Sequence, residues 1–328
     1  MKPSGDRLRG AGLVVLGGVA FVLAGCGNGQ NSLQPESPQS GSIATLWWIM
    51  LGVSTFGLAV IVGLLVASWF KRDEDGRERP ATITVIVLGI VTPILVIAAL
   101  FAYSDIFLIR GTSPPSPTSL VAKRALDITV VGHQFWWEAR YSNGDVVTAN
   151  ELHIPVRTPV VVSVTSNDVI HSFWVPELNR KIDLEPGRTN RVELYASNVG
   201  RYRGQCAEFC GLQHAHMAFY VFADPPAAFA RWLRREGRPA AQSSRLFLDR
   251  CSNCHQIRGT SATADVGPDL THVGSRTTIA AGTLTNTLAN MERWIAHPQD
   301  VKPGNQMPDL HLTDAQVHEL ARYLERLK

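Results

Sequence analysis

Charged side chains are scarce in this chain of 328 residues. Asp, Glu, Lys and Arg make up 18% of it, whereas apolar residues make up 45%. This low content of charged residues favours membrane-spanning segments. The net charge of +3 is far from the basic excess of nucleic-acid-binding domains, so nucleic acid is excluded as a partner. A chain of this length is expected to form two or three modules.

Cysteine is equally rare, and the chain has only five. Each lies in a short motif with its own chemistry, so no structural disulfide is needed to account for any of them. The five are Cys26, Cys206, Cys210, Cys251 and Cys254.

Two stretches lack charge altogether, Ser42 to Phe70 and Ala81 to Ser104. Each is long enough to cross about 30 Å of hydrocarbon as a helix. The loop KRDEDGRERP between them is rich in Lys and Arg, whereas residues 27–41 contain neither. The positive-inside rule then predicts a cytoplasmic loop and a transmembrane helical hairpin over 42–110, with both ends facing outward.

The first 25 residues have the composition of a secretory signal, with Lys2, Arg7 and Arg9 ahead of a short apolar segment. They end in Leu-Ala-Gly before Cys26, which resembles a bacterial lipobox. That resemblance implies cleavage before Cys26 and lipid on its thiol; the alternative is an uncleaved first helix. Residues 26–41 are expected to form a polar tether.

Short strand-like segments follow a Pro/Ser-rich linker at 111–119. ALDITVV, VVVSVT, NRVELY and MAFYVF are rich in β-branched and aromatic residues, with turn residues between them. Residues 120–225 are therefore expected to form an all-β sandwich or barrel.

The segment QCAEFCGLQHAHM (205–217) concentrates soft and borderline metal ligands. Cys206, Cys210, His214 and Met217 suit copper better than magnesium or calcium. Two thiolates four residues apart can bridge a pair of copper ions, and His171 in SNDVIHSFW is the candidate for the further nitrogen ligand. A disulfide and a zinc site are the alternatives.

This ordered run, with a His in an apolar strand upstream, resembles cytochrome c oxidase subunit II and its binuclear copper-A site. The resemblance implies a cupredoxin fold and the copper ligands His171, Cys206, Cys210, His214 and Met217. It also implies that the backbone carbonyl of Glu208 contacts copper, while its carboxylate joins a magnesium site shared with subunit I. His216 has the wrong spacing and is interpreted as non-ligating.

The segment Gly-His-Gln-Phe-Trp-Trp (132–137) resembles the aromatic segment of the same family. Phe135 occupies the place of the Trp that accepts electrons in relatives, with Trp136 and Trp137 beside it; ordinary packing is the alternative role of these rings. A second departure lies in the hairpin, where apolar Ile86 replaces an acidic residue of a proton path. The nearest acid is Glu78.

Residues 226–242 are predicted to be a basic helix and linker. Cys251, Cys254 and His255 then form C-x-x-C-H, which attaches haem c through both thiols and binds iron through His255. Met307, on a Gly/Pro-rich loop, is the predicted sixth ligand, ahead of Met291, His297, His311 and His318. Gly-Pro-Asp-Leu (267–270) resembles the haem-side loop of class I cytochromes c, so residues 243–328 are expected to form that all-α domain.

The resemblance covers about residues 42–328 and implies the electron-transfer subunit II of a haem-copper oxidase. Electrons would pass from haem c through copper A to subunit I, where oxygen is reduced with proton pumping. The implied setting is the bacterial plasma membrane, with both metal domains outside. The implied partners are subunit I, other oxidase subunits and an external cytochrome c or upstream respiratory complex.

Three other functions are compatible with parts of this pattern. A copper-A subunit of a nitric oxide reductase is the nearest alternative. A lipoprotein that delivers copper and haem needs open coordination, which a complete ligand set does not offer. Quinol oxidase subunits share the hairpin and fold but lack the copper ligands.

Overall fold

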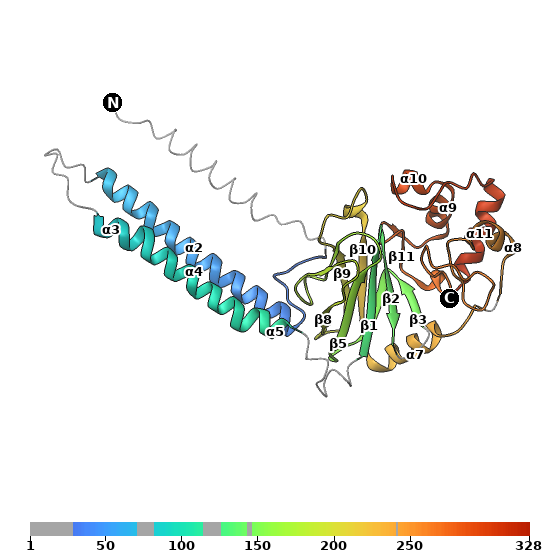
Figure 1. Cartoon of the computed structure of the whole chain (residues 1–328), viewed down its shortest axis with the longest axis horizontal. Coiled ribbons are helices and arrows are strands. Elements are labelled where there is room, and N and C mark those ends of the chain that lie inside the picture. The colour runs from blue at the N-terminus through green and yellow to red at the C-terminus, as the bar shows by residue number, and fades with distance from the viewer. Residues whose placement is uncertain (1–28, 71–81, 114–125, 143–145, 241) are drawn as a thin grey trace, which may run out of the picture.

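The computed structural model describes residues 29–70, 82–113, 126–142, 146–240 and 242–328. The predicted signal peptide with Cys26, the basic loop with Glu78 and most of the linker at 111–119 lie outside these residues. Three parts follow one another in space: a helical hairpin, a β domain (126–224) and a C-terminal domain (242–328). The β domain lies between the other two (Figure 1).

Two long helices form the hairpin. The first is α2 (Pro38–Phe70). The second is continuous from Thr82 to Thr112 and consists of α3 (Thr82–Ile86), η1 (Val87–Val91), α4 (Thr92–Tyr103), η2 (Ser104–Ile109) and α5 (Arg110–Thr112). Both are long and apolar enough to cross a membrane. Each extends beyond its uncharged stretch, α2 at its start and the second helix at its end, where Thr112 Oγ1 donates to the Leu108 carbonyl oxygen.

The hairpin is fastened to the β domain at one end. Ser40 Oγ donates to the carbonyl oxygen of Glu177 at 2.6 Å, and the Glu36 amide donates to the same oxygen at 2.9 Å. Arg180 Nε donates to Thr112 Oγ1 at the end of the second helix. The last part of the expected tether is therefore bound to the β domain, with the hairpin base beside it.

The β domain consists of two five-stranded sheets. One has the order β3-β2-β1-β5-β8 and the other β4-β10-β9-β6-β7. The strands are β1 (Leu126–His133), β2 (Trp136–Tyr141), β3 (Val146–Ala149), β4 (Glu151–Pro155), β5 (Val160–Ser166), β6 (His171–Trp174), β7 (Ile182–Leu184), β8 (Asn190–Leu194), β9 (Gly200–Cys206) and β10 (Ala218–Asp224).

Alternating apolar residues explain this sandwich. Along β1, Leu126, Ile128 and Val130 are buried while their neighbours are not, because successive strand residues face opposite sides. Trp137 and Phe219 pack in the common core, with ring centroids 5.1 Å apart. The predicted all-β cupredoxin-like domain is thus confirmed.

Helix α7 (Pro226–Glu236) packs on the β domain. Its Trp232 stacks on His153 with ring centroids 4.2 Å apart and contacts Tyr141 at 5.1 Å. Residues 226–242 were predicted to be a helix and linker. These contacts show that the helical part packs on the β domain.

The C-terminal domain has its own core and mostly helical structure. Its elements are α8 (Arg245–Arg250), η4 (Val273–Ser275), β11 (Thr278–Ile279), β12 (Leu284–Thr285), α9 (Leu288–Ala296), α10 (Pro298–Val301) and α11 (Asp314–Glu325). Thr313 and Gln316 form a capping box at the start of α11. The small β11–β12 hairpin is an addition to the predicted all-α domain.

Candidate metal and haem sites

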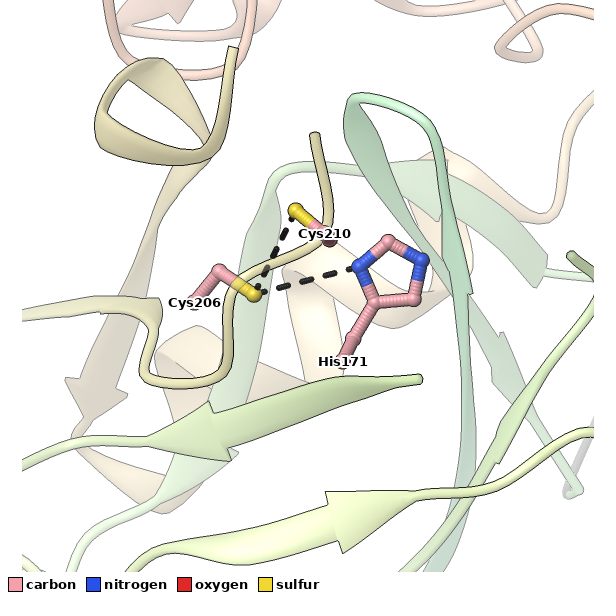
Figure 2. A group of neighbouring side chains, drawn as sticks. All are labelled: His171, Cys206 and Cys210. Atoms are coloured by element: carbon pink, nitrogen blue, oxygen red, sulfur yellow. Dashed lines mark hydrogen bonds between the residues drawn. The ribbon is translucent and has the colours of Figure 1, made fainter. Parts of the chain in front are cut away.

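The loop between β9 and β10 and the start of β6 bring the predicted copper ligands together. Cys206 ends β9 and Met217 immediately precedes β10, so the loop between these strands carries the motif. His171 begins β6, which pairs with β9. Figure 2 shows the His171 ring and the two thiols facing one another.

The sulfur and nitrogen atoms form one cluster. Cys206 Sγ lies 3.8 Å from Cys210 Sγ and 3.8 Å from His171 Nδ1. Cys210 Sγ lies 3.7 Å from His214 Nδ1 and 3.8 Å from Met217 Sδ. The two cysteines are free, and their separation is far beyond the roughly 2.05 Å of a disulfide bond. The disulfide alternative is thus not what the structure contains.

This geometry fits bound metal. With metal–sulfur bonds of about 2.3 Å and tetrahedral angles, two sulfurs on one metal lie about 3.8 Å apart. The Glu208 carbonyl oxygen is 3.1 Å from Cys206 Sγ, and Met217 Sδ is 3.8 Å from Cys210 Sγ, so an oxygen and a thioether would be the further donors to a bound metal. Thiolate, imidazole and thioether together suit copper.

Asp168 holds the His171 ring in place. Its Oδ1 lies 2.8 Å from His171 Nε2, so Nδ1 is the nitrogen that faces Cys206. Burial opposes protonation of His171, but the hydrogen bonds and negative charges of Asp168 and Cys206 together outweigh burial and raise the pKa of the imidazole. A carboxylate behind a ligating His is the usual outer contact of a metal site. Asp168 Oδ2 also accepts from the Gln134 amide at 2.6 Å.

The two thiols titrate as a pair. The hydrogen bond from the Cys210 thiol lowers the pKa of Cys206. The same bond, together with burial, raises the pKa of Cys210. One thiolate therefore forms readily without metal, whereas a second negative charge at 3.8 Å needs a cation to compensate it.

Glu208 and His216 both direct their side chains away from the cluster. The Glu208 carboxylate lies 3.3 Å from Lys181 Nζ on the surface, which leaves its backbone carbonyl for the cluster. His216 Nδ1 is 2.9 Å from Gln213 Oε1, and its side chain is exposed.

A cavity of about 380 Å³ lies where the C-terminal domain meets the β domain. Cys251, Cys254, His255 and Met307 all line it, together with Met291. His255 Nδ1 donates to the Pro268 carbonyl oxygen at 2.9 Å, so Nε2 remains available to iron.

Further features of the cavity fit haem c. A Cβ on Gly267 would lie 2.8 Å from His255 Cε1, so only glycine lets the ring occupy this position. Burial lowers the pKa of His255, which favours the neutral imidazole that binds iron. Arg276 also lines the cavity, and its buried Nε has no hydrogen-bond partner among the described residues. Of the two methionines, Met291 packs in the domain core.

The residues of the aromatic segment 132–137 lie in two places, the haem cavity and the core of the β domain. Phe135 and Trp136 line the cavity, whereas Trp137 is completely buried in the β domain. Between cavity and copper cluster lies Gln134, whose Nε2 donates to the Cys210 carbonyl oxygen at 2.6 Å. Gln134 and the cavity-lining Lys302 were not predicted from the sequence. No periodicity or ligand spacing marks them, because their roles depend on contacts between segments far apart.

A membrane-type hairpin, a β domain with a soft-ligand cluster and a C-terminal domain with a haem cavity define a membrane-anchored electron-transfer protein. Residues 142–223 match the model of the cytochrome c oxidase subunit II periplasmic domain, and residues 240–328 match that of cytochrome c. The chain belongs to the cytochrome c oxidase subunit II family, in the form with a fused cytochrome c domain.

Two curated relatives match this chain over nearly their whole length. Cytochrome c oxidase subunit 2 of Alkalihalophilus pseudofirmus is 31% identical, with 94% of this chain and 95% of that one covered. The Bacillus subtilis protein of the same name is 27% identical, with 96% and 97% covered. The solved periplasmic domain of subunit II from Bradyrhizobium japonicum is 34% identical, covers 33% of this chain and 91% of its own, and has a TM-score of 0.33.

Membership defines the general role. The protein is a subunit of cytochrome c oxidase, an electron-transfer component with a periplasmic domain that associates with subunit I and other oxidase subunits. The two matched domains imply copper A and haem c.

Proposed function

We propose that this subunit transfers electrons from its own covalent haem c through the binuclear copper centre to subunit I, which reduces oxygen to water and pumps protons. When bound, haem c and copper A supply one-electron redox chemistry. The observation that carries the proposal is the position of the haem cavity. It is lined by both the haem-attachment residues and the segment Gln134-Phe135-Trp136 of the copper-bearing domain.

The residues have separate tasks in this proposal. His171, Cys206, Cys210, His214, Met217 and the Glu208 carbonyl hold copper. Cys251 and Cys254 attach haem, and His255 and Met307 bind its iron. The rigid setting of the donors, with His171 fixed by Asp168, keeps ligand positions constant between redox states.

The Glu208 carboxylate is proposed to bind magnesium at the contact with subunit I. Its partly exposed position on the surface of the β domain supports this assignment, since Mg²⁺ usually takes only one or two protein carboxylates. The domains are proposed to follow the sequence boundaries, and the two long helices to span the plasma membrane with both metal domains on its outer face. An external cytochrome c or an upstream respiratory complex is the proposed donor to the haem.

Purification of the membrane complex tests the proposal. We expect the large oxidase subunit to copurify, with a copper pair and one covalent haem per copy of this chain. Oxygen uptake should be lost in Cys206→Ser while the haem bands remain. Zinc in place of copper, or uptake that survives the substitution, would refute the assignment.

A further inference from the structure

The β11–β12 hairpin of the C-terminal domain belongs to two surfaces at once. Arg276, Thr278 and Ala280 line the haem cavity. The same stretch of chain is bound by the β domain through Glu151. A wall of the haem cavity is therefore also a contact between the domains.

Glu151, the first residue of β4, is only 4% exposed. Its Oε1 accepts from the amides of Thr277 and Thr278 at 2.9 and 3.0 Å, and from their hydroxyls at 2.6 and 3.2 Å. All four donors belong to the C-terminal domain. A buried carboxylate is costly unless it is hydrogen-bonded, so the burial of Glu151 is compensated by the docked hairpin.

The turn of this hairpin is held by a further contact with the β domain. Ala280 and Ala281 have φ angles of 52° and 54°, followed by Gly282 at 75°. Left-handed backbone is unfavourable for alanine and persists only where surrounding contacts hold it. Here the Ala281 carbonyl oxygen accepts from the Ala218 amide of β10 at 3.1 Å.

A second buried ionisable side chain, that of Lys302, reaches from the C-terminal domain to the β domain. Lys302 of the C-terminal domain is 3% exposed, and its Nζ donates to the Phe135 carbonyl oxygen at 3.0 Å and to Ala280 O at 3.4 Å. Next to it, Gln213 Nε2 donates to the Pro303 carbonyl oxygen at 2.6 Å. Each domain thus contributes one buried ionisable side chain that bonds to the backbone of the other.

We propose that Glu151 is a positioning residue that clamps the β11–β12 hairpin and holds the C-terminal domain in one fixed dock for electron transfer. This rests on the proposed function and specifies how the haem is presented to the copper centre. In the fixed dock the haem cavity stays against Gln134 and Phe135. Electron transfer from haem to copper then needs no rotation of the C-terminal domain about the segment that joins it to α7.

The first test measures docking without relying on turnover. Hydrogen exchange at the amides of Thr277 and Thr278 in the full-length protein reports whether Glu151 still binds them. In Glu151→Leu we expect protection of both amides to fall by about tenfold or more, the effect of losing charged hydrogen bonds. Glu185→Leu, at a partly exposed glutamate of the same domain, is the matched control and should leave protection unchanged.

The second test measures transfer from haem to copper after a rapid one-electron injection, in buffers of increasing viscosity. A fixed dock predicts a wild-type rate that does not depend on viscosity. Glu151→Leu should be slower and viscosity-dependent, while the haem and copper spectra stay normal. Thr277→Val with Thr278→Val removes two donors from the opposite side and should have the same effect if Glu151→Leu does not fold.

The outcomes separate the two proposals. A wild-type rate that falls with viscosity, or unchanged amide protection and transfer in Glu151→Leu, would overturn the fixed dock. If the wild-type haem never reduces copper although both centres have normal spectra, the proposed function fails. In that case hydrogen exchange at Thr277 and Thr278 still shows whether Glu151 holds the C-terminal domain in place.

Discussion

The side-chain amide of Gln134 donates to the carbonyl oxygen of Cys210 at 2.6 Å. Gln134 lines the haem cavity, and Cys210 carries one of the two clustered thiols. Gly211 allows this contact, since a Cβ there would lie 3.1 Å from both Gln134 Nε2 and Phe135 Cζ. One side chain therefore connects the haem cavity to the copper loop through a hydrogen bond.

Gln134→Leu should slow electron transfer from haem to copper severalfold, because electrons tunnel better through a hydrogen bond than through a van der Waals gap. Phe135→Trp keeps that bond and should change the rate little. Rapid injection with optical detection at both centres measures both variants. Equal rates in wild type and Gln134→Leu would show that the link is not used.

Replacing either thiol should destroy the binuclear centre. Cys206→Ser and Cys210→Ser each remove a bridging ligand, so we expect the mixed-valence copper spectrum to disappear and the haem bands to remain. Electron paramagnetic resonance and copper analysis give the result. A mixed-valence spectrum that persists in either variant would mean that the thiols do not bridge two ions.

Asp168→Asn should weaken copper binding about 10- to 100-fold, the usual effect of losing the outer partner of a ligating His. The change keeps the shape of the side chain but removes the charge that fixes His171. Copper competition with a chelator measures the affinity. Asp183→Asn, at a half-exposed carboxylate near Lys181, is the control; an equal loss there would point to a general charge effect.

Met307→Ala should lower the haem reduction potential, because Met ligation raises it. Met291→Leu conserves volume in the core and should leave the potential nearly unchanged. Redox titration distinguishes the two methionines. Retention of the Met–iron charge-transfer band in Met307→Ala would assign the ligand elsewhere.

Sequence reasoning predicted the parts of this molecule whose signals are local. Uncharged runs predicted the hairpin, and alternating residues predicted strands such as β1. Ligand spacing from Cys206 to Met217 predicted a cluster that the fold brings together with His171. In each case the pattern that predicts the structure lies within a short stretch of sequence.

The contacts between domains could not be predicted in this way. Glu151 and Thr277 are 126 positions apart, and a lone glutamate at the start of a strand resembles a solvated surface residue. The residues next to Lys302 in the sequence likewise give no sign that its side chain is buried. The packing of Trp232 on the β domain could not be predicted for the same reason: the composition of residues 226–242 predicts a basic helix and linker but not the surface that the helix contacts.

The most direct test of the account is the kinetic order of copper reduction by the fused haem. In full-length protein, one electron injected at the haem should appear at copper with a first-order rate constant that is the same at every protein concentration. A rate that falls in proportion to dilution would mean that electrons reach copper from another molecule, and would contradict direct transfer within the chain.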